Sequence, residues 1–142
     1  MKKDFKFLHS LRVRYAEIDG QKIVFNGHYL TYLSVALMEY LRNMKLNYYE
    51  ISKNYEFDVA LVKITLEYLS PAFFDEILDI GVKVIELGNS SLKINYEIFK
   101  SGDSDPIFIA NAIYANFNTK TKKSQIIPNR IREKIAHFEG LL

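Results

Sequence analysis

Apolar side chains recur at spacings of three and four from residue 29 to about residue 44, and this stretch constrains the fold more than any other. The spacing predicts one long amphipathic helix. Its apolar positions are Tyr29, Leu33, Ala36, Leu37, Tyr40, Leu41 and Met44. Since an amphipathic helix has to bury its apolar side, we expect this one to pack against a sheet.

The segments before and after this helix alternate between apolar and polar residues, which is typical of half-buried strands. The first strand is expected over residues 5–17, with Phe5, Phe7, His9, Leu11, Val13 and Tyr15 on one face. Four more strands are expected, beginning at about residues 58, 78, 92 and 107. Residues 47–55 are expected to form a short extra helix or turn, and residues 130–138 a closing helix with Pro128 near its start.

Short turn sequences separate the four later strands. Ser70-Pro71 ends the first of them, because proline cannot donate a hydrogen bond to a strand ladder. Gly88-Asn89 predicts a tight turn between the next two, because both residues tolerate positive φ. Short turns make consecutive strands antiparallel. The order of elements therefore predicts an α+β fold, in which one curved sheet packs against the long helix.

The composition fits a single domain over residues 1–142 and narrows the class of protein. The chain has 19 basic and 17 acidic residues without a long basic tract, so we expect no nucleic-acid partner. The absence of cysteine excludes disulfides and thiolate nucleophiles. No apolar run suits a signal peptide or a membrane span, so a cytoplasmic protein is expected. Motifs for metal ions and for phosphate loops are missing, so we expect neither a metal nor a cofactor.

Chemistry is expected at the beginning of the long helix. The first backbone N–H groups of a helix lack internal partners and lie at the positive end of the helix dipole, so they stabilise a developing oxyanion. Asp19 lies a few residues upstream of the predicted helix start near Asn26 and Gly27. A carboxylate beside an oxyanion site suits the hydrolysis of an activated acyl group.

Two runs carry a resemblance to a known family: Arg-Val-Arg-Tyr-Ala-Glu-Ile-Asp at residues 12–19 and Ile-Val-Phe-Asn-Gly-His-Tyr-Leu at residues 23–30. Together they resemble the opening of the 4-hydroxybenzoyl-CoA thioesterase family. The resemblance continues through residues 67–72, 88–91 and 127–132, and so covers nearly the whole chain. It implies the hotdog fold, in which an antiparallel five-stranded sheet wraps around a long central helix. It also implies a homodimer or homotetramer, with two sheets joined edge to edge and the active site at the subunit boundary.

The same resemblance implies roles for individual residues. The catalytic aspartate of the family falls on Asp19, its supporting tyrosine on Tyr15, and its helix-opening position, whose backbone N–H is an oxyanion donor, on Asn26. The turn at residues 88–91 matches one that lies near the pantetheine arm in the family, which makes Ser90 and Ser91 candidate substrate-binding residues. The acyl pocket is expected to be lined by strand and helix residues such as Tyr29, Tyr32, Val59 and Leu61.

Each candidate also has an ordinary structural interpretation. Asp19 suits a turn or a helix cap, and Asn26 suits an N-cap. Tyr15 lies on the apolar face of the predicted strand and suits the core. His28, in the first helical turn, is a candidate for substrate binding and equally suits a surface or an interface. If Asp19 is catalytic, it either activates water as a general base or attacks the thioester carbon itself.

We interpret the sequence as that of an acyl-CoA thioesterase, which hydrolyses its acyl-CoA substrate to a free acid and coenzyme A. One alternative is a non-catalytic hotdog module that binds an acyl chain or a partner. This alternative rests on Lys22, because family members usually carry glycine at this position, and the departure bears on the conformation of the connection after Asp19. Another alternative is a thioesterase that acts on acyl carrier protein.

Overall fold

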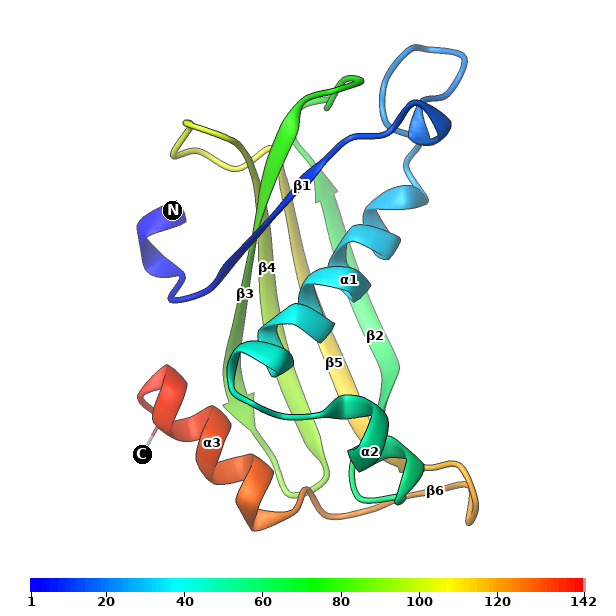
Figure 1. Cartoon of the computed structure of the whole chain (residues 1–142), viewed down its shortest axis with the longest axis vertical. Helices are drawn as coiled ribbons and strands as arrows, with labels where there is room; N and C mark the ends of the chain where they lie inside the picture. Colours follow the sequence, from blue (N-terminus) through cyan, green and yellow to red (C-terminus); the bar gives the residue numbers. More distant parts are fainter. Residues whose placement is uncertain (142) are drawn as a thin grey trace.

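A computed structural model describes residues 1–141, and Figure 1 shows one curved sheet with a long helix lying across its inner face. The helices are α1 (His28–Asn43), α2 (Tyr48–Lys53) and α3 (Asn129–Glu139), with two short 3₁₀ turns, η1 (Lys2–Asp4) and η2 (Tyr15–Glu17). The strands are β1 (Leu8–Arg12), β2 (Val59–Tyr68), β3 (Ile77–Leu87), β4 (Ser91–Lys100), β5 (Phe108–Asn118) and β6 (Lys123–Ser124). The predicted long helix, short helix and closing helix are all present.

All strand pairings are antiparallel, in the order β1-β3-β4-β5-β2, and the short β6 pairs with β5. β2 comes directly after the helical segment in the chain, yet it pairs with β5 at the far side of the sheet. The chain therefore crosses the sheet through α1, which leaves β1 and β2 as the two edges (Figure 1). A sheet of five main strands curled around one central helix is the hotdog arrangement, so the predicted fold is confirmed.

The predicted apolar stripe of α1 forms the centre of the core. All seven of its positions are buried, and Tyr32 joins them. Facing them are inward side chains of the sheet, among them Ile80 of β3 and Ile94 of β4. Each large side chain buried in this way contributes about 1.5–3 kcal/mol of transfer free energy. Burial on the sheet, rather than helix propensity, therefore holds α1 in place.

The first strand is shorter than predicted, because β1 ends at residue 12. The side chains of Arg14 and Glu17 pair at 2.7 Å and close the η2 turn directly after it. This turn rotates Tyr15 out of the sheet face and leaves it 78% exposed. The core position predicted for Tyr15 is therefore wrong, since the local Arg–Glu pair overrides the alternating pattern.

The turn between β3 and β4 forms where predicted, but for a different reason. Gly88 and Asn89 both keep φ outside the left-handed region. The Gly88 N–H donates to the Ser91 carbonyl at 2.7 Å, and a Cβ on Gly88 would lie 2.8 Å from Ser91 Oγ. Glycine suits this turn because a Cβ would crowd the Ser91 side chain, and not because of positive φ.

β2 also departs from its predicted pattern. Its register against β5 shifts between Leu61 and Lys63, which is the signature of a β-bulge. Val62, which simple alternation places on the inner face with Ile64 and Leu66, is 64% exposed as a result. The bulge therefore turns one apolar side chain outward on an edge strand.

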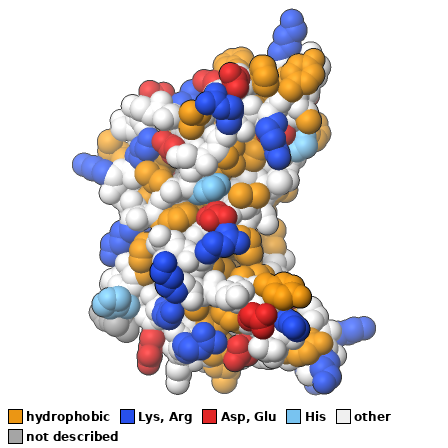
Figure 2. Space-filling view, viewed as in Figure 1, with side chains coloured by type: hydrophobic (Ala, Val, Ile, Leu, Met, Phe, Trp, Pro, Cys, Tyr) orange, Lys and Arg blue, Asp and Glu red, His pale blue; other side chains and the backbone are white. Residues whose placement is uncertain are grey.

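Basic and acidic side chains are interspersed over the face drawn in Figure 2, in keeping with the near balance of charges in the sequence. The basic tract at residues 120–123 leads from β5 into β6 and is exposed. Within residues 1–141, no helix combines the length and the hydropathy needed to cross a bilayer.

Candidate active site

Asp19 lies at the turn of a small hairpin between η2 and α1. Ile18 and Val24 form an isolated antiparallel bridge at its base. Within the hairpin, the Asp19 N–H donates to the Ile23 carbonyl at 2.9 Å, and the Lys22 N–H donates to the Asp19 carbonyl at 2.9 Å. The hairpin therefore folds the chain back, so that Asp19 lies beside the residues that lead into α1.

Lys22 occupies the position where the resembled family usually carries glycine. Its φ is 65°, in the left-handed region that glycine adopts without steric cost. A side chain in this region costs roughly 1–2 kcal/mol. The Lys22 side chain is exposed and does not line the cavity beside Asp19. The hairpin thus follows a path suited to glycine, and the departure at Lys22 leaves this cavity open.

The start of α1 leaves backbone donors without partners. Gly27 is the N-cap of the helix, so the N-cap role considered for Asn26 is wrong. The His28 N–H donates to the Phe25 carbonyl at 3.0 Å. The N–H groups of Asn26 and Gly27 donate to no backbone carbonyl in the described part of the chain. Both groups are therefore available to an anionic oxygen at the positive end of the α1 dipole.

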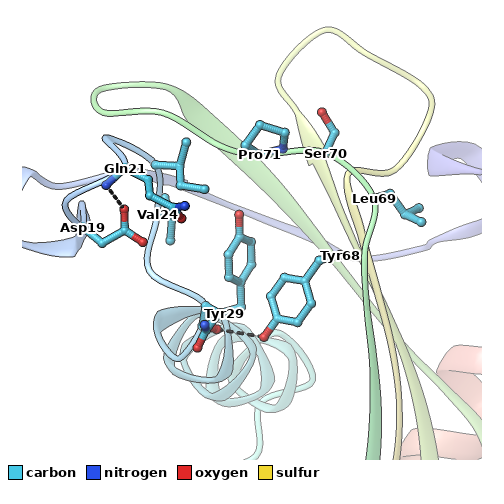
Figure 3. A pocket seen from close by; sticks show the side chains of 10 residues that line it. Asp19, Gln21, Val24, Tyr29, Tyr68, Leu69, Ser70 and Pro71 are labelled. Carbon is cyan, nitrogen blue, oxygen red and sulfur yellow. Dashed lines mark hydrogen bonds between the residues drawn. The ribbon is translucent and has the colours of Figure 1, made fainter.

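A cavity of about 320 Å³ opens between the hairpin, the start of α1 and the segment that follows β2 (Figure 3). Its polar lining comprises Asp19, Gln21, Asn26, Tyr29, Tyr68 and Ser70. Asp19 is half-buried, and its Oδ1 accepts a hydrogen bond from the Gln21 N–H at 2.7 Å. Figure 3 shows the other carboxylate oxygen turned toward the cavity. One oxygen of Asp19 is thus held by the turn, while the second faces the space that it shares with Asn26.

Two tyrosines shape this cavity. Tyr68, at the end of β2, donates its hydroxyl hydrogen bond to the Asn26 carbonyl at 2.9 Å. The Tyr29 ring stacks on Phe108 with centroids 4.7 Å apart, and its hydroxyl points into the cavity (Figure 3). Burial raises the pKa of both Tyr29 and Tyr68, so both hydroxyls keep their protons at neutral pH and can donate. Sequence reasoning missed Tyr68, because nothing local indicates that the end of β2 meets the start of α1.

A second cavity, of about 430 Å³, lies between α1 and β2 and is mostly apolar. Val59 and Leu61, which were expected in the acyl pocket, line this second cavity, whereas Tyr29 lines the first. Tyr32, expected in the same pocket, is instead buried in the core. The structure thus divides the expected lining residues between two cavities along α1 and the core beneath them.

Tyr15 and His28 lie outside the lining of the Asp19 cavity. The Tyr15 ring packs edge-on against Phe74, with centroids 5.6 Å apart. His28 packs in the same way against Phe25, at 5.9 Å. The catalytic role of Tyr15 and the substrate-binding role of His28 therefore stay predictions, and neither side chain meets Asp19 within one chain.

Ser90 lies in the turn between β3 and β4, and Ser91 begins β4, at the opposite end of the sheet from the Asp19 hairpin (Figure 1). Arg132 of α3 anchors this turn, because it donates to the carbonyls of Gly88 and Asn89 at 2.7 and 3.0 Å. Within one chain the turn is too far away to serve the cavity. Contact of either serine with a substrate there would require a second copy of the chain.

Comparison with known proteins identifies the family of this chain. The sequence pattern of the Thioesterase superfamily matches residues 21–107, which is more than half of the chain. This chain belongs to the thioesterase superfamily. It is accordingly a thioester hydrolase, and the enzyme class expected from the sequence is confirmed.

Relatives of this thioesterase match most of its length. The chain is 27% identical over 128 residues to a chloroplastic acyl-acyl carrier protein thioesterase of Arabidopsis thaliana, covering 90% of this chain and 66% of that protein. A hypothetical protein from Aquifex aeolicus is 26% identical in sequence, and its crystal structure matches this one with a TM-score of 0.82. The match covers 91% of this chain and 98% of that chain. The crystal structure of a 1,4-dihydroxy-2-naphthoyl-CoA thioesterase from Synechocystis superimposes with a TM-score of 0.83 at 18% identity. The match covers 92% of this chain and 95% of that chain, and at this low identity it shows a common fold only.

Proposed function

We propose that this thioesterase hydrolyses acyl-CoA in the cavity beside Asp19. The observation that carries the proposal is the shared lining: the Asp19 carboxylate and Asn26, whose N–H has no backbone partner among the described residues, line one cavity. The apolar part of the acyl group would extend toward the second cavity between α1 and β2. Both features suit a substrate with a reactive carbonyl and an apolar tail.

In the proposed reaction the thioester carbonyl oxygen accepts a hydrogen bond from the Asn26 N–H, at the positive end of α1. A water oxygen attacks the carbonyl carbon while Asp19 takes the water proton, and the C–S bond then breaks as the coenzyme A sulfur receives that proton. Alternatively, Asp19 attacks the carbon itself, the thiolate leaves, and water hydrolyses the resulting mixed anhydride. A single oxyanion donor contributes about 3–4 kcal/mol to such reactions.

The substitution Asp19→Asn tests the proposal. Asparagine keeps an oxygen for the Gln21 N–H but can neither accept a proton efficiently nor attack the thioester. We expect kcat to fall at least a hundredfold, measured as coenzyme A release with a thiol reagent over a panel of acyl-CoA esters. Asp103→Asn, in the exposed turn between β4 and β5, is the matched control and should keep wild-type turnover. Near-normal activity of Asp19→Asn would remove this residue from the mechanism.

A carrier-bound substrate is the second candidate, because the Arabidopsis relative is an acyl-acyl carrier protein thioesterase. Comparing one acyl group on coenzyme A and on acyl carrier protein decides between them. If kcat/KM is at least tenfold higher for the carrier-bound ester, acyl carrier protein esters rather than acyl-CoA are the substrate.

We also propose that two copies of the chain assemble along β2. Its outer side has no strand partner among the described residues, because β2 is an edge of the sheet. Leu61, Val62 and Tyr68 on β2 are exposed apolar side chains, as is Leu30 of α1, which lines the cavity between the two elements. Figure 2 shows hydrophobic side chains along the side where these two elements lie. A long edge strand offers its unpaired N–H and C=O groups to another chain, and these apolar side chains would be buried by such a pairing.

The charges on β2 favour one register for such a pair. Lys63, Thr65 and Glu67 alternate with the inward residues of the strand and are exposed. If Thr65 faces Thr65 of the partner subunit in an antiparallel pair, each Lys63 lies opposite a Glu67. Opposite charges placed across a strand pair stabilise it by roughly 0.2–1 kcal/mol each. The same register places the partner's β2 beside Tyr68 and Leu69, which line the cavity, so each subunit would border the other's site.

A further inference from the structure

Glu17 is a buried carboxylate two residues before Asp19, and it lies outside the cavity lining. The residue is only 4% exposed. Oε1 accepts hydrogen bonds from the Arg14 N–H and from the Tyr32 hydroxyl, both at 2.8 Å. Oε2 accepts two more from the Arg14 guanidinium, at 3.0 and 2.7 Å. Both carboxylate oxygens are therefore fully hydrogen-bonded.

The charge of Glu17 is maintained by these four donors. Burial by itself would raise the pKa of Glu17, but the hydrogen bonds from Arg14 and Tyr32 outweigh burial and lower that pKa. Burial and the bond to Glu17 raise the pKa of Tyr32, so its hydroxyl remains a donor at neutral pH. The Tyr32–Glu17 contact is accordingly a charge-assisted hydrogen bond in a dry environment, which is the stronger kind.

Glu17 is bonded to both sides of the connection between the hairpin and α1. Its backbone carbonyl accepts from the Phe25 N–H at 2.9 Å, directly before Asn26. Its side chain bonds to Tyr32, one turn into the helix. Asp19 lies between Glu17 and Phe25, and the unpartnered N–H groups of Asn26 and Gly27 lie between Phe25 and Tyr32. The geometry of both segments therefore depends on where Glu17 is held.

We infer that Glu17 and Tyr32 are positioning residues, which hold Asp19 at a fixed place relative to the start of α1. This inference rests on the proposed function, in which Asp19 acts on a carbonyl bound at the Asn26 N–H. Neither residue touches substrate, because Tyr32 is 2% exposed and Glu17 is nearly as deeply buried. A reacting group displaced by about 1 Å can lose a factor of roughly a hundred in rate.

The substitution Tyr32→Phe tests this inference, with Tyr40→Phe as the matched control. Tyr40 lies two turns further along the same helix and donates to the buried carboxylate of Glu139 at 2.9 Å. Each variant loses one buried tyrosine–glutamate hydrogen bond, so both should lower the melting temperature to a similar extent. We expect kcat of Tyr32→Phe to fall at least tenfold with KM within twofold of wild type, while Tyr40→Phe keeps kcat within twofold.

Two further measurements separate positioning from a general loss of stability. Glu17→Gln keeps an acceptor for Tyr32, so its kcat should exceed that of Glu17→Ala. Amide hydrogen exchange at Asp19 and Lys22 should be at least tenfold faster in Tyr32→Phe than in Tyr40→Phe. Equal exchange rates at these two amides, or equal kcat values in the two tyrosine variants, would overturn the inference.

These outcomes differ from those that would defeat the proposed function. If the wild-type chain releases no thiol from acyl-CoA or from acyl carrier protein, or if Asp19→Asn keeps full turnover, the proposed function fails and the positioning role fails with it. If the wild type is active and Asp19→Asn is not, but Tyr32→Phe turns over at the wild-type rate, only the positioning role fails.

Discussion

Lys22 holds a left-handed backbone conformation next to the residue on which the proposed chemistry depends. Its φ is 65°. Four other residues also have φ in the left-handed region: Lys45 at 61°, Tyr55 at 60°, Asp75 at 71° and Lys122 at 61°. The chain therefore accepts the cost of this conformation at several exposed turns. At Lys22 the N–H donates to the Asp19 carbonyl and closes the turn. The departure from glycine thus affects the stability of the hairpin more than its shape.

Substitutions at Lys22 should therefore separate the effect of the hairpin conformation on activity from the free-energy cost of the left-handed backbone. Lys22→Gly relieves the left-handed strain and should leave kcat within twofold of wild type. Lys22→Val, with a β-branched side chain, should lower the free energy of unfolding by about 1–2 kcal/mol. Urea unfolding and thiol release measure the two effects. The interpretation would be contradicted if Lys22→Gly abolished activity, because the lysine side chain itself would then be needed.

At the scale of elements, α3 is attached to the core through a buried carboxylate in its last turn. Glu139 Oε1 accepts from the Tyr40 hydroxyl of α1, while Oε2 is buried without a partner in the described residues. Burial raises the pKa of Glu139, against the opposing effects of the Tyr40 hydrogen bond and the positive charges of Lys6 and Lys83. The folded chain therefore holds the Glu139 proton more tightly than the unfolded chain does.

This pKa shift predicts how stability depends on pH. Since the folded-state pKa of Glu139 is raised, its contribution to stability is present below the ordinary glutamate range and is lost as pH rises through the raised value. Glutamine does not ionise, so Glu139→Gln removes the stability loss that accompanies ionisation of Glu139. Relative to wild type, the variant should therefore gain free energy of unfolding as pH rises from the ordinary glutamate pKa to neutral. Urea unfolding at a fixed protein concentration measures the difference, and a difference independent of pH would contradict the assignment.

At the scale of the whole molecule, β1 and β2 are the two edges of the sheet within residues 1–141, and β2 is the longer of them. Leu61 and Val62 are exposed there beside the alternating charges of Lys63 and Glu67. The end of β2 also carries Tyr68 into the lining of the Asp19 cavity. A partner on this edge would therefore extend the sheet and complete the site in one step.

Charge reversal on β2 tests both the dimer and its register. Lys63→Glu and Glu67→Lys each place like charges opposite one another, so each should raise the dimer dissociation constant at least tenfold. The double variant restores opposite charges, as does an equimolar mixture of the two single variants, and both should dimerise as the wild type does. Sedimentation velocity measures the assembly. Lys120→Glu, in the exposed turn after β5, is the control that should leave assembly unchanged.

The register would be contradicted if the double variant dimerised more weakly than either single variant. A wild-type chain that sediments as a monomer would contradict the dimer itself. Neither result would bear on the Asp19 substitution, which is measured on turnover.

The sequence by itself determined the features that depend on neighbouring residues. Spacings of three and four define α1, alternation defines the long strands, and the hairpin turn brings Asp19 close to Asn26 because few residues separate them. The family resemblance added the hotdog order of strands. Local pattern failed at Tyr15, where the pairing of Arg14 with Glu17 ended the strand early.

Only the tertiary structure decided which distant segments meet. The pairing of β2 with β5 carries Tyr68 to the carbonyl of Asn26, and the packing of α3 brings Glu139 to Tyr40. The same topology holds Ser90 at the far end of the sheet from Asp19. Contacts of this kind arise from the burial of whole faces against one another, and no short stretch of sequence encodes its partner.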